Sequence, residues 1–380
     1  MIYLDNAATS YPKPEIVYTA LGRFLREVGG NPGRGNYRVA IEAERVLIDV
    51  RGKLARLIEA ATPDRVIFTC NTTDALNMAI KGALREGDHV ITSELEHNSV
   101  LRPLARLKQT RQIQVTTLPF DVRGQVDPDA FRRAITPQTR MLILTHASNV
   151  IGTIQPIEEV GKIARDHNLL FLVDAAQTLG KIDINVQRAK IDLLAGPGHK
   201  GLMGPPGTGF LYVGERAVLD PWREGGTGGN SLLELQPPEY PFFLEAGTPN
   251  TVGLAALGVA LEYLAERGID RIREHELQLL ELLADELCQL PDVSIFGPPD
   301  LDHAVGVISF TMEVFEPQEV GIVLDESFDI AVRSGLHCAP LTHKRLGTLP
   351  TGTIRVSPGA FTTVADIEQF ISALKTLALS

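Results

Sequence analysis

Apolar residues in the first two-thirds of the chain form short runs, and segments with helical spacing separate several of these runs. Between residues 39 and 57 the apolar positions recur at steps of three or four, which predicts an amphipathic helix. Residues 73–84 and 157–167 have similar spacing. Such alternation is typical of an α/β domain with a mostly parallel sheet. The expected strands are residues 65–69, 89–92, 114–118, 140–145, 169–174, 192–195 and 209–213.

The pattern changes after about residue 251, where strands and helices are less regularly interleaved. This change favours an α+β region in the last third of the chain. The expected helices are residues 252–267, 269–290 and 364–377, and the expected strands are residues 305–310, 330–333 and 353–356.

The two patterns predict two domains. A large α/β domain is expected over residues 15–255, and a small α+β domain over residues 1–14 and 256–380. Residues 221–249 are rich in glycine and proline and are expected to form a long ordered loop. Long loops in compact domains are often functional.

The charge and the apolar runs exclude several classes of protein. With 36 basic and 47 acidic residues, the formal net charge is −11 at pH 7, so we expect no nucleic-acid partner. No run reaches the roughly 18 apolar residues of a membrane-spanning helix. The first residues lack the basic and apolar regions of a signal peptide. We therefore expect a cytoplasmic protein without a membrane partner.

The chain has three cysteines, Cys70, Cys288 and Cys338. Their odd number and the lack of a CxxC pair argue against a disulfide framework or a zinc site. We therefore expect a reducing compartment and no metal. Because a lone cysteine is most often a small buried hydrophobic residue, we expect Cys70 and Cys288 to be buried.

The strongest chemical signal is an aspartate that ends a strand and a lysine that follows in a glycine-rich segment. Asp174 ends residues 169–174, and ligands of open α/β sheets collect at the carboxyl ends of strands. A carboxylate there can hold a protonated pyridine nitrogen, and Lys200, flanked by Gly198 and Gly201, can bond covalently to a planar ligand. Alone, the aspartate would more often be a cap and the lysine solvated, but the pair favours a site for pyridoxal phosphate (PLP).

Two further motifs follow predicted strands. Thr72 and Thr73 lie where a helix is expected to begin, and helix N-termini bind phosphate well. His97 follows residues 89–92 and can stack on a flat ring. Taken singly, the threonines would more often belong to an ordinary helix cap and His97 would be a polar loop residue.

The last motif lies near the C-terminus. Cys338 stands between His337 and Ala339 on a predicted loop, where nearby cations would favour its reactive thiolate. Arg355 can bind a carboxylate through two parallel hydrogen bonds, although a structural ion pair is an equal alternative for this residue.

These motifs, in this order, resemble the class V aminotransferase family. They are most similar to its cysteine desulfurase branch of the group II type, which has Arg-x-Gly-x-His-Cys-Ala near the C-terminus; residues 333–339 here read Arg-Ser-Gly-Leu-His-Cys-Ala. The resemblance extends from Tyr3-Leu-Asp-Asn-Ala-Ala-Thr9 to the last helix. It implies the fold type I of PLP-dependent transferases, with a large domain built on a mostly parallel seven-stranded sheet, and a homodimer with shared sites.

The resemblance also implies roles in binding the cofactor, PLP. Lys200 would bond to PLP covalently, Asp174 would pair with its ring nitrogen, and Gln177 would bind its ring hydroxyl. His97 would stack on the ring and transfer protons. The phosphate would be held by Thr72, Thr73 and His199, and by Thr248 from the partner subunit.

The implied reaction converts L-cysteine to L-alanine. Asn149 and Arg355 would bind the substrate carboxylate, and Arg34 and Arg333 would line the substrate pocket. Cys338 would accept the sulfur as a persulfide and pass it to an acceptor protein of unknown identity, as in iron–sulfur cluster assembly.

Two positions depart from the family pattern. Relatives commonly have a serine or threonine two residues before the histidine that precedes the lysine, and here this residue is Pro197, which has neither a hydroxyl nor an N–H. Phe361-Thr362-Thr363 stands where many relatives have Tyr-Asn-Thr. Other reactions of the same fold stay open, namely selenocysteine or cysteine sulfinate cleavage, transamination and epimerisation, as does a protein without catalytic activity.

Overall fold

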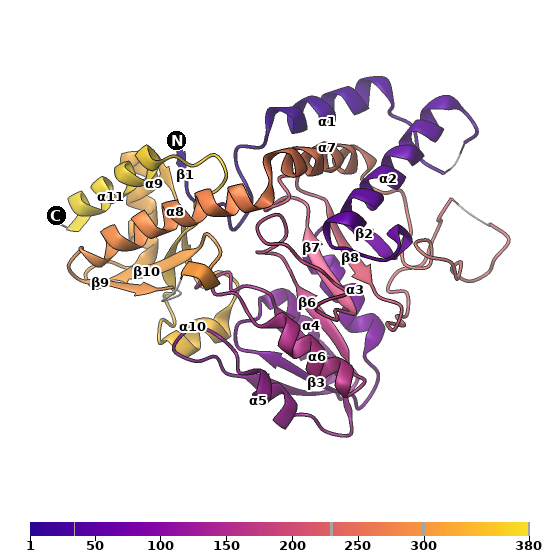
Figure 1. The fold of residues 1–380 in the computed structure, drawn as a ribbon, viewed down its shortest axis with the longest axis horizontal. Coiled ribbons are helices and arrows are strands. Elements are labelled where there is room, and N and C mark those ends of the chain that lie inside the picture. Colours follow the sequence, from indigo (N-terminus) through magenta and orange to yellow (C-terminus); the bar gives the residue numbers. More distant parts are fainter. Residues whose placement is uncertain (34, 229–230, 298–300, 379–380) are drawn as a thin grey trace.

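A seven-stranded sheet lies at the centre of the larger part of the protein (Figure 1). The computed structural model describes residues 1–33, 35–228, 231–297 and 301–378. The strand order is β2-β8-β7-β6-β5-β3-β4, and β8 alone runs antiparallel to its neighbours, so the predicted mostly parallel sheet is confirmed. The strands are β2 (Val66–Thr69), β3 (His89–Ser93), β4 (Gln114–Leu118), β5 (Thr139–Thr145), β6 (Leu170–Asp174), β7 (Leu193–Pro197) and β8 (Gly209–Val213).

Helices cover both faces of this sheet, which explains why its strands read as continuous apolar runs. Successive residues of a strand point to opposite faces, so Leu142 and Leu144 of β5 pack in one core and Met141 and Ile143 pack in the other. Two helices cover the face of Met141, namely α3 (Thr72–Ala83) and α4 (Asn98–Thr110). Four helices cover the face of Leu142: α2 (Arg38–Leu57), α5 (Pro128–Arg133), α6 (Ile157–Asp166) and α7 (Thr251–Arg267). Helix α1 (Glu15–Glu27) packs on the outside of α7.

A four-stranded antiparallel sheet forms the core of the smaller part, in the order β12-β13-β10-β9. Phe310 and Phe370 meet edge to face in this core. Its strands are β9 (Val293–Phe296), β10 (Ile308–Met312), β12 (Arg333–Gly335) and β13 (Thr353–Val356), and its helices are α8 (Ile269–Cys288), α9 (Pro317–Phe328), α10 (Pro340–Leu346) and α11 (Val364–Ala378).

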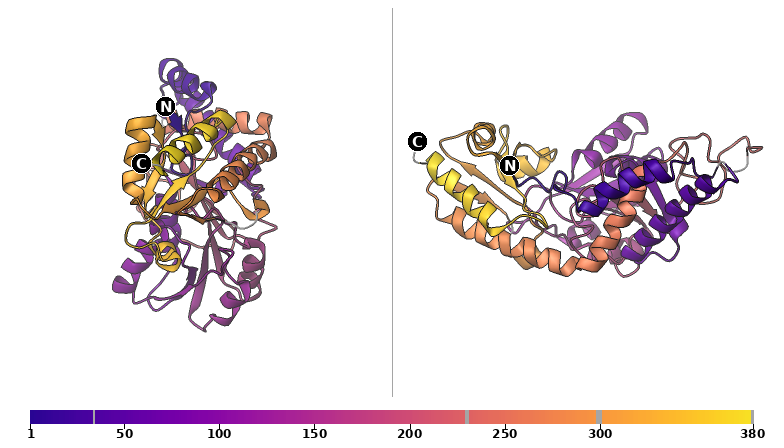
Figure 2. Two further views of the ribbon diagram at one scale, coloured as in Figure 1. Left: turned by 90° about the vertical axis from the view of Figure 1, so that its left-hand side faces the viewer. Right: turned by 90° about the horizontal axis from the view of Figure 1, so that it is seen from above.

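The N-terminal residues join the smaller part of the molecule. β1 (Ile2–Tyr3) pairs in parallel with β11 (Ile330–Ala331), and Asp5 forms a bridge with Ser357. Figures 1 and 2 place the N-terminus beside the elements of the C-terminal third. The first strand thus lies beside β11, a short strand that precedes β12 in the sequence. The predicted division between residues 255 and 256 stays a prediction, and α7 spans it.

The structure corrects two predicted strands and adds elements that the sequence pattern did not predict. The strand predicted over 330–333 is two short strands, β11 and β12, which belong to different sheets. The strand predicted over 305–310 is β10, which begins three residues later. The strands and α-helices that the sequence pattern did not predict are β1, β9, α1, α4, α5, α9 and α10. Among them, β9 and α9 are partly exposed, and β1 and α5 are too short to show a clear period.

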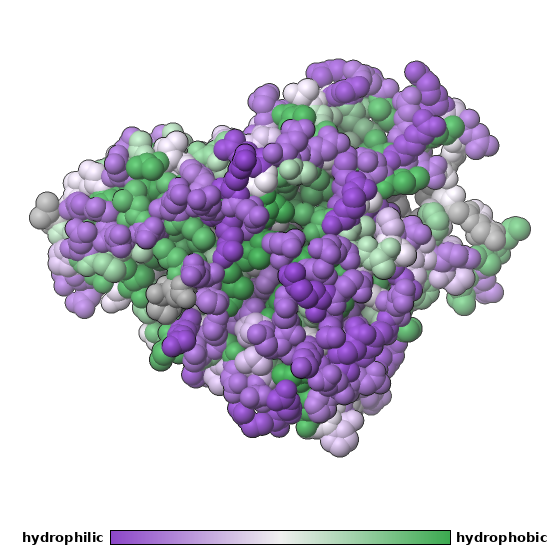
Figure 3. All heavy atoms as spheres, viewed as in Figure 1, coloured by the Kyte–Doolittle hydropathy of each residue, from purple (hydrophilic) through white to green (hydrophobic). Residues whose placement is uncertain are grey.

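The long loop predicted after β8 is confirmed, since the described residues between β8 and α7 form no helix or strand. It projects at the right of Figure 1, and apolar side chains gather at that edge in Figure 3. Leu232 and Leu235 are strongly exposed there, with relative accessibilities of 95% and 82%. In the part of the chain that the structure describes, no helix is both long and apolar enough to cross a lipid bilayer.

Candidate active site

The carboxyl ends of β5, β6 and β7 meet at one edge of the large sheet. Asp174, the last residue of β6, pairs in register with Thr145 of β5 and Ala195 of β7. A cavity of about 110 Å³ opens at this edge. Such an edge is where open α/β sheets bind ligands. Eight predicted site residues line the cavity: Thr72, Thr73, His97, Asn149, Asp174, Gln177, His199 and Lys200.

Asp174 and Lys200 form the charged centre of the cavity. Asp174 is buried, and its Oδ1 accepts the N–H of Ala176 at 2.9 Å. Burial raises the pKa of Asp174, and the Lys200 charge opposes this shift. Burial lowers the pKa of Lys200 to about 8, Asp174 partly offsets the lowering, and Arg355 and Arg333 add to it. A much larger fraction of Lys200 is therefore neutral and nucleophilic than in an exposed lysine.

The N-terminal segment holds the loop that carries Lys200. Ser10 Oγ donates to the carbonyl of Lys200 at 3.0 Å, and Lys13 Nζ donates to the carbonyl of the preceding residue at 2.7 Å. Gly201 lies so close to the backbone of Leu179 that a Cβ would stand 2.2 Å from its carbonyl oxygen. A glycine is therefore needed after the lysine because of this close approach.

The N-terminus of α3 forms one wall of the cavity. Asn71 caps the helix by accepting the N–H of Asp74 at 2.9 Å, and Thr72 and Thr73 occupy the first turn. Unpaired amides and the helix dipole make such a turn an anion site. Across the cavity, burial lowers the pKa of His199 to about 4, and its buried Nδ1 has no hydrogen-bond partner among the described residues.

His97 caps α4, and Ser99 links it to α3. Nδ1 of His97 accepts the N–H of Ser99 at 3.0 Å, so the proton of the neutral ring is on Nε2. Ser99 Oγ lies 2.9 Å from the same Nδ1 and 2.8 Å from Thr73 Oγ1. Burial, aided by Lys200, lowers the pKa of His97 to about 4. The sequence motif around His97 contains Ser99, but its contact with Thr73 was not foreseen.

Arg355 is fully buried beside the cavity. Its Nη1 donates to the carbonyl of Asn149 at 3.0 Å, and its Nη2 pairs with Asp5 Oδ1 at 2.6 Å. Its Nε has no partner among the described residues. The structural ion pair considered for Arg355 is thus present, with a free N–H on the same guanidinium. Asp5 was missed as its partner because 350 residues separate the two.

The Cys338 loop docks beside His97. The carbonyl of Cys338 accepts the N–H of Asn98, the first residue of α4, at 2.7 Å. Both His337 and Cys338 have positive φ angles, 47° and 59°, a conformation that costs non-glycine residues energy and must be held by its surroundings. Arg333 Nη2 lies 3.7 Å from Cys338 Sγ. Arg333 thus contacts the thiol, although we predicted it as a residue of the substrate pocket.

The remaining predictions concern Thr248, which was expected to act at the partner's site, Arg34, and the two cysteines that were expected to be buried. Thr248 is exposed and lines another pocket, with Cys70. Arg34 lies outside the described residues. Cys70 and Cys288 are both exposed, so the prediction that they are buried is wrong. Cys288 follows the buried Leu287, and the next residue of a helix turns about 100° away from the core.

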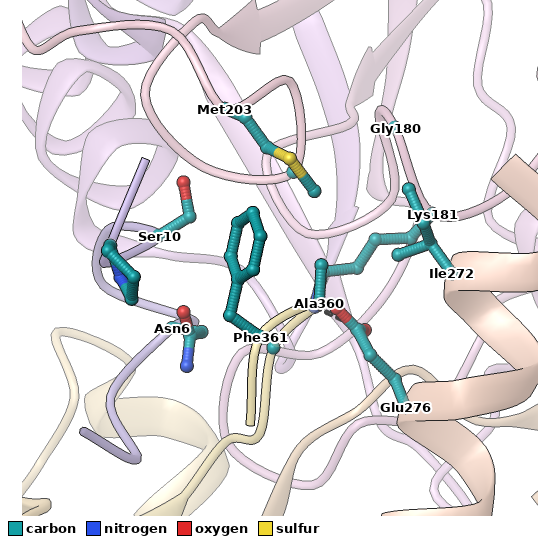
Figure 4. Close-up of a pocket in the computed structure, with 12 residues that line it drawn as sticks. Asn6, Ser10, Gly180, Lys181, Met203, Ile272, Glu276, Ala360 and Phe361 are labelled. Atoms are coloured by element: carbon teal, nitrogen blue, oxygen red, sulfur yellow. Dashed lines mark hydrogen bonds and ion pairs between the residues drawn. The ribbon is translucent and has the colours of Figure 1, made fainter. Parts of the chain in front are cut away.

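A second, separate pocket lies behind the Lys200 loop and is lined by Met203 and Phe361 (Figure 4). At its edge Lys181 Nζ and Glu276 Oε2 form an ion pair of 2.7 Å, with both side chains at least nine-tenths buried. Lys181 follows β6, and Glu276 is on α8. The pair therefore joins the large sheet to the helix that leads into the smaller part.

Together the residues of the first cavity define a ligand with three features. The turn of Thr72 and Thr73 fits an anion, Asp174 fits a cationic ring nitrogen, and Lys200 fits an electrophilic carbon. Among the described residues, no group of three or more His, Cys, Asp or Glu side chains is arranged to hold a metal ion. The donor set thus suits an organic anion.

Known proteins resemble this chain over its whole length. The family model of class-V aminotransferases matches residues 2–370. A probable cysteine desulfurase of Methanothermobacter thermautotrophicus is 36% identical, covering 99% of this chain and 94% of that protein. The apo structure of a cysteine desulfurase from Thermococcus onnurineus superposes with a TM-score of 0.93 at 34% identity, covering 100% of this chain and 94% of that one. The cysteine desulfurase CsdA (S-sulfonic acid) of Escherichia coli gives 0.89 at 31% identity, with the same coverages. The chain therefore belongs to the class-V aminotransferase family and, within it, to the cysteine desulfurases.

Proposed function

We propose that the protein is a PLP-dependent cysteine desulfurase that converts L-cysteine to L-alanine and takes the sulfur onto Cys338. One observation carries this proposal. The carbonyl of Cys338 accepts a hydrogen bond from the N–H of Asn98, the residue that follows His97. His97 lines the same cavity as Asp174 and Lys200. The loop that carries the Cys338 thiol is thus held next to His97, which shares its cavity with the Lys200 amine and the buried Asp174 carboxylate.

The cavity residues fit PLP. Thr72, Thr73 and His199 would hold its phosphate, and Asp174 would hold its protonated ring nitrogen. When bound, PLP supplies an electron sink for the substrate carbon skeleton. Pro197 is buried in β7 and is not part of the cavity wall, so it provides no phosphate contact.

Two residues move protons. The Lys200 amine, with its pKa near 8, takes the proton from the α-carbon of the substrate once it is free. His97 is neutral near pH 7 and carries its proton on Nε2, so it can donate there while Ser99 holds Nδ1. The fixed tautomer gives His97 one direction of proton transfer.

Cys338 performs the sulfur transfer. Its thiolate attacks the substrate sulfur, the S–S bond forms, and the bond between that sulfur and the β-carbon breaks with its electron pair kept on carbon, where a proton completes L-alanine. The substrate carbon is reduced and the two sulfurs become a persulfide, so no external oxidant is needed. Arg333 Nη2 lies 3.7 Å from Cys338 Sγ and thus contacts the sulfur that attacks the substrate.

We further propose a homodimer that works in the cytoplasm and supplies sulfur to an acceptor protein, as in iron–sulfur cluster assembly. The exposure of Thr248 and of the loop leucines Leu232 and Leu235 supports a second copy as the partner. In this arrangement Thr248 would reach the partner's phosphate site.

Replacement of Cys338 by alanine tests the proposed function. With L-cysteine and a reductant, the wild-type protein should form alanine and sulfide in equal amounts. C338A should lose at least roughly 100-fold in turnover, equivalent to about 2.7 kcal/mol in the barrier, while it keeps the absorbance of bound PLP. The control is C288A, which removes an exposed thiol from α8 and should behave as wild type. Full activity in C338A would exclude Cys338 as the sulfur acceptor and favour cleavage of selenocysteine or cysteine sulfinate.

Replacement of Arg355 by lysine tests recognition of the substrate carboxylate. Lysine keeps the charge beside Asp5 but loses the planar pair of N–H groups. A charge-assisted hydrogen bond contributes about 1.5–3 kcal/mol, so kcat/KM for L-cysteine should fall roughly 10- to 100-fold, mainly through KM. Cysteamine, which lacks the carboxylate, should bind R355K and wild type alike. An equal loss for both compounds would instead indicate a purely structural role.

A further inference from the structure

Glu96 is a buried acid directly behind the active site. It precedes His97, between β3 and α4, and its side chain is fully buried. Its Oε1 accepts the hydroxyl of Ser93 at 2.8 Å and the N–H of Thr145 at 3.0 Å. Its Oε2 is also buried and has no hydrogen-bond partner among the described residues. The carboxyl thus ties the end of β3 to the end of β5.

A second carboxyl lies close to Glu96. Thr145, which donates to Glu96, is the register partner of Asp174 on the next strand. No described residue forms an ion pair with Glu96, and Asp174 is the charged group that acts on it, while the Lys200 charge acts on Asp174. An ionised Glu96 would therefore bury an unpaired charge with one bare oxygen beside another carboxylate. Burial, with a smaller contribution from Asp174, raises the pKa of Glu96 to about 8.

We propose that Glu96 is a neutral acid in the working enzyme, and that it positions Thr145 while leaving Asp174 as the only charged carboxylate behind the cofactor. This inference rests on the proposed function, because the charge of Asp174 matters only when it faces a ring nitrogen. Glu96 does not line the cavity, so it is a positioning residue that acts through Thr145 and Asp174. Two neighbouring buried carboxyls favour a state in which one of them is protonated, and a proton held on Glu96 leaves Asp174 ionised to pair with the ring nitrogen.

Glu96→Gln separates the neutral acid from the carboxylate. Glutamine keeps the acceptor oxygen and places an N–H donor where the acid has its O–H, so it mimics the neutral form. In the unfolded chain Glu96 loses its proton near 4.5, but in the folded protein only near pH 8. The folded wild type thus holds the extra proton between these values and loses stability as pH rises through this window. Glutamine has no such proton to lose.

The first measurement is the melting temperature of the PLP-loaded wild type and E96Q from pH 5 to pH 9. The melting temperature of E96Q minus that of wild type should rise by about 2 °C or more between pH 5 and pH 8, and then stay level. The control is E94Q, which changes a partly exposed carboxylate 3.6 Å from Arg345 and should show no such rise. A difference that is constant from pH 5 to pH 9 would overturn the proposal.

The second measurement is turnover of L-cysteine by E96Q at pH 7. We expect kcat within about twofold of wild type, because the hydrogen bonds to Ser93 and Thr145 remain. A loss of tenfold or more at pH 7, with PLP still bound, would mean that the charge of Glu96 is needed and would overturn the proposal. If the wild type binds no PLP, the proposed function fails, but the melting comparison still tests the neutral state of Glu96.

Discussion

Replacement of Lys200 by alanine should abolish turnover of L-cysteine and leave the fold intact. Lys200 is the only lysine among the described residues that line the cavity, and in the proposed function it would serve both as the covalent anchor and as the base. A positioned proton-transfer group contributes at most roughly 10⁴-fold, so the loss should reach at least this factor when the anchor is removed as well. The measurement is alanine formation at saturating L-cysteine.

The control for this prediction is K162A, which removes an exposed lysine of α6. It should retain wild-type turnover and PLP absorbance. K200A should also lose the absorbance of covalently bound PLP, and its melting temperature should stay close to that of wild type without PLP. Turnover in K200A within tenfold of wild type would contradict the role of Lys200.

Replacement of Glu276 by alanine should cost about 3–5 kcal/mol of the free energy of unfolding. The change leaves the Lys181 ammonium buried without its partner, and an unpaired buried charge is much more costly than the net value of the pair. Figure 4 shows the two side chains pointing toward each other across the edge of the pocket. The measurement is urea unfolding of E276A and wild type at pH 7.

The matched control removes both charges. The double variant K181M/E276L should recover most of the stability lost in E276A, because an apolar pair of similar volume needs no compensating charge. Breaking the exposed pair of Arg188 and Glu158 with E158A should cost far less stability than E276A does. A cost below about 1 kcal/mol for E276A would mean that water reaches Lys181.

The strands of the large sheet and several of the helices that pack on it could be predicted from the sequence. Their apolar residues recur with the period of a strand or a helix, so local order is enough to find them, as for β6 and α7. The partly exposed β9 and α9 have weaker periods and were missed. The prediction that Cys288 is buried rested on its residue type alone, and it failed because the position of a residue on its helix decides its exposure.

The sequence by itself determined which residues are candidates for the chemistry of the site, because Asp174, Lys200, His97 and Cys338 stand in motifs that can be read locally. Only the tertiary structure decided which of these side chains meet and in what state. The partners of Arg355, Glu276 and Glu96 come from elements up to 350 residues apart, and the register of β5 on β6 sets the place of Thr145 beside Asp174. Burial and charge pairing depend on these long-range contacts, and therefore so do the pKa values of Lys200 and Glu96.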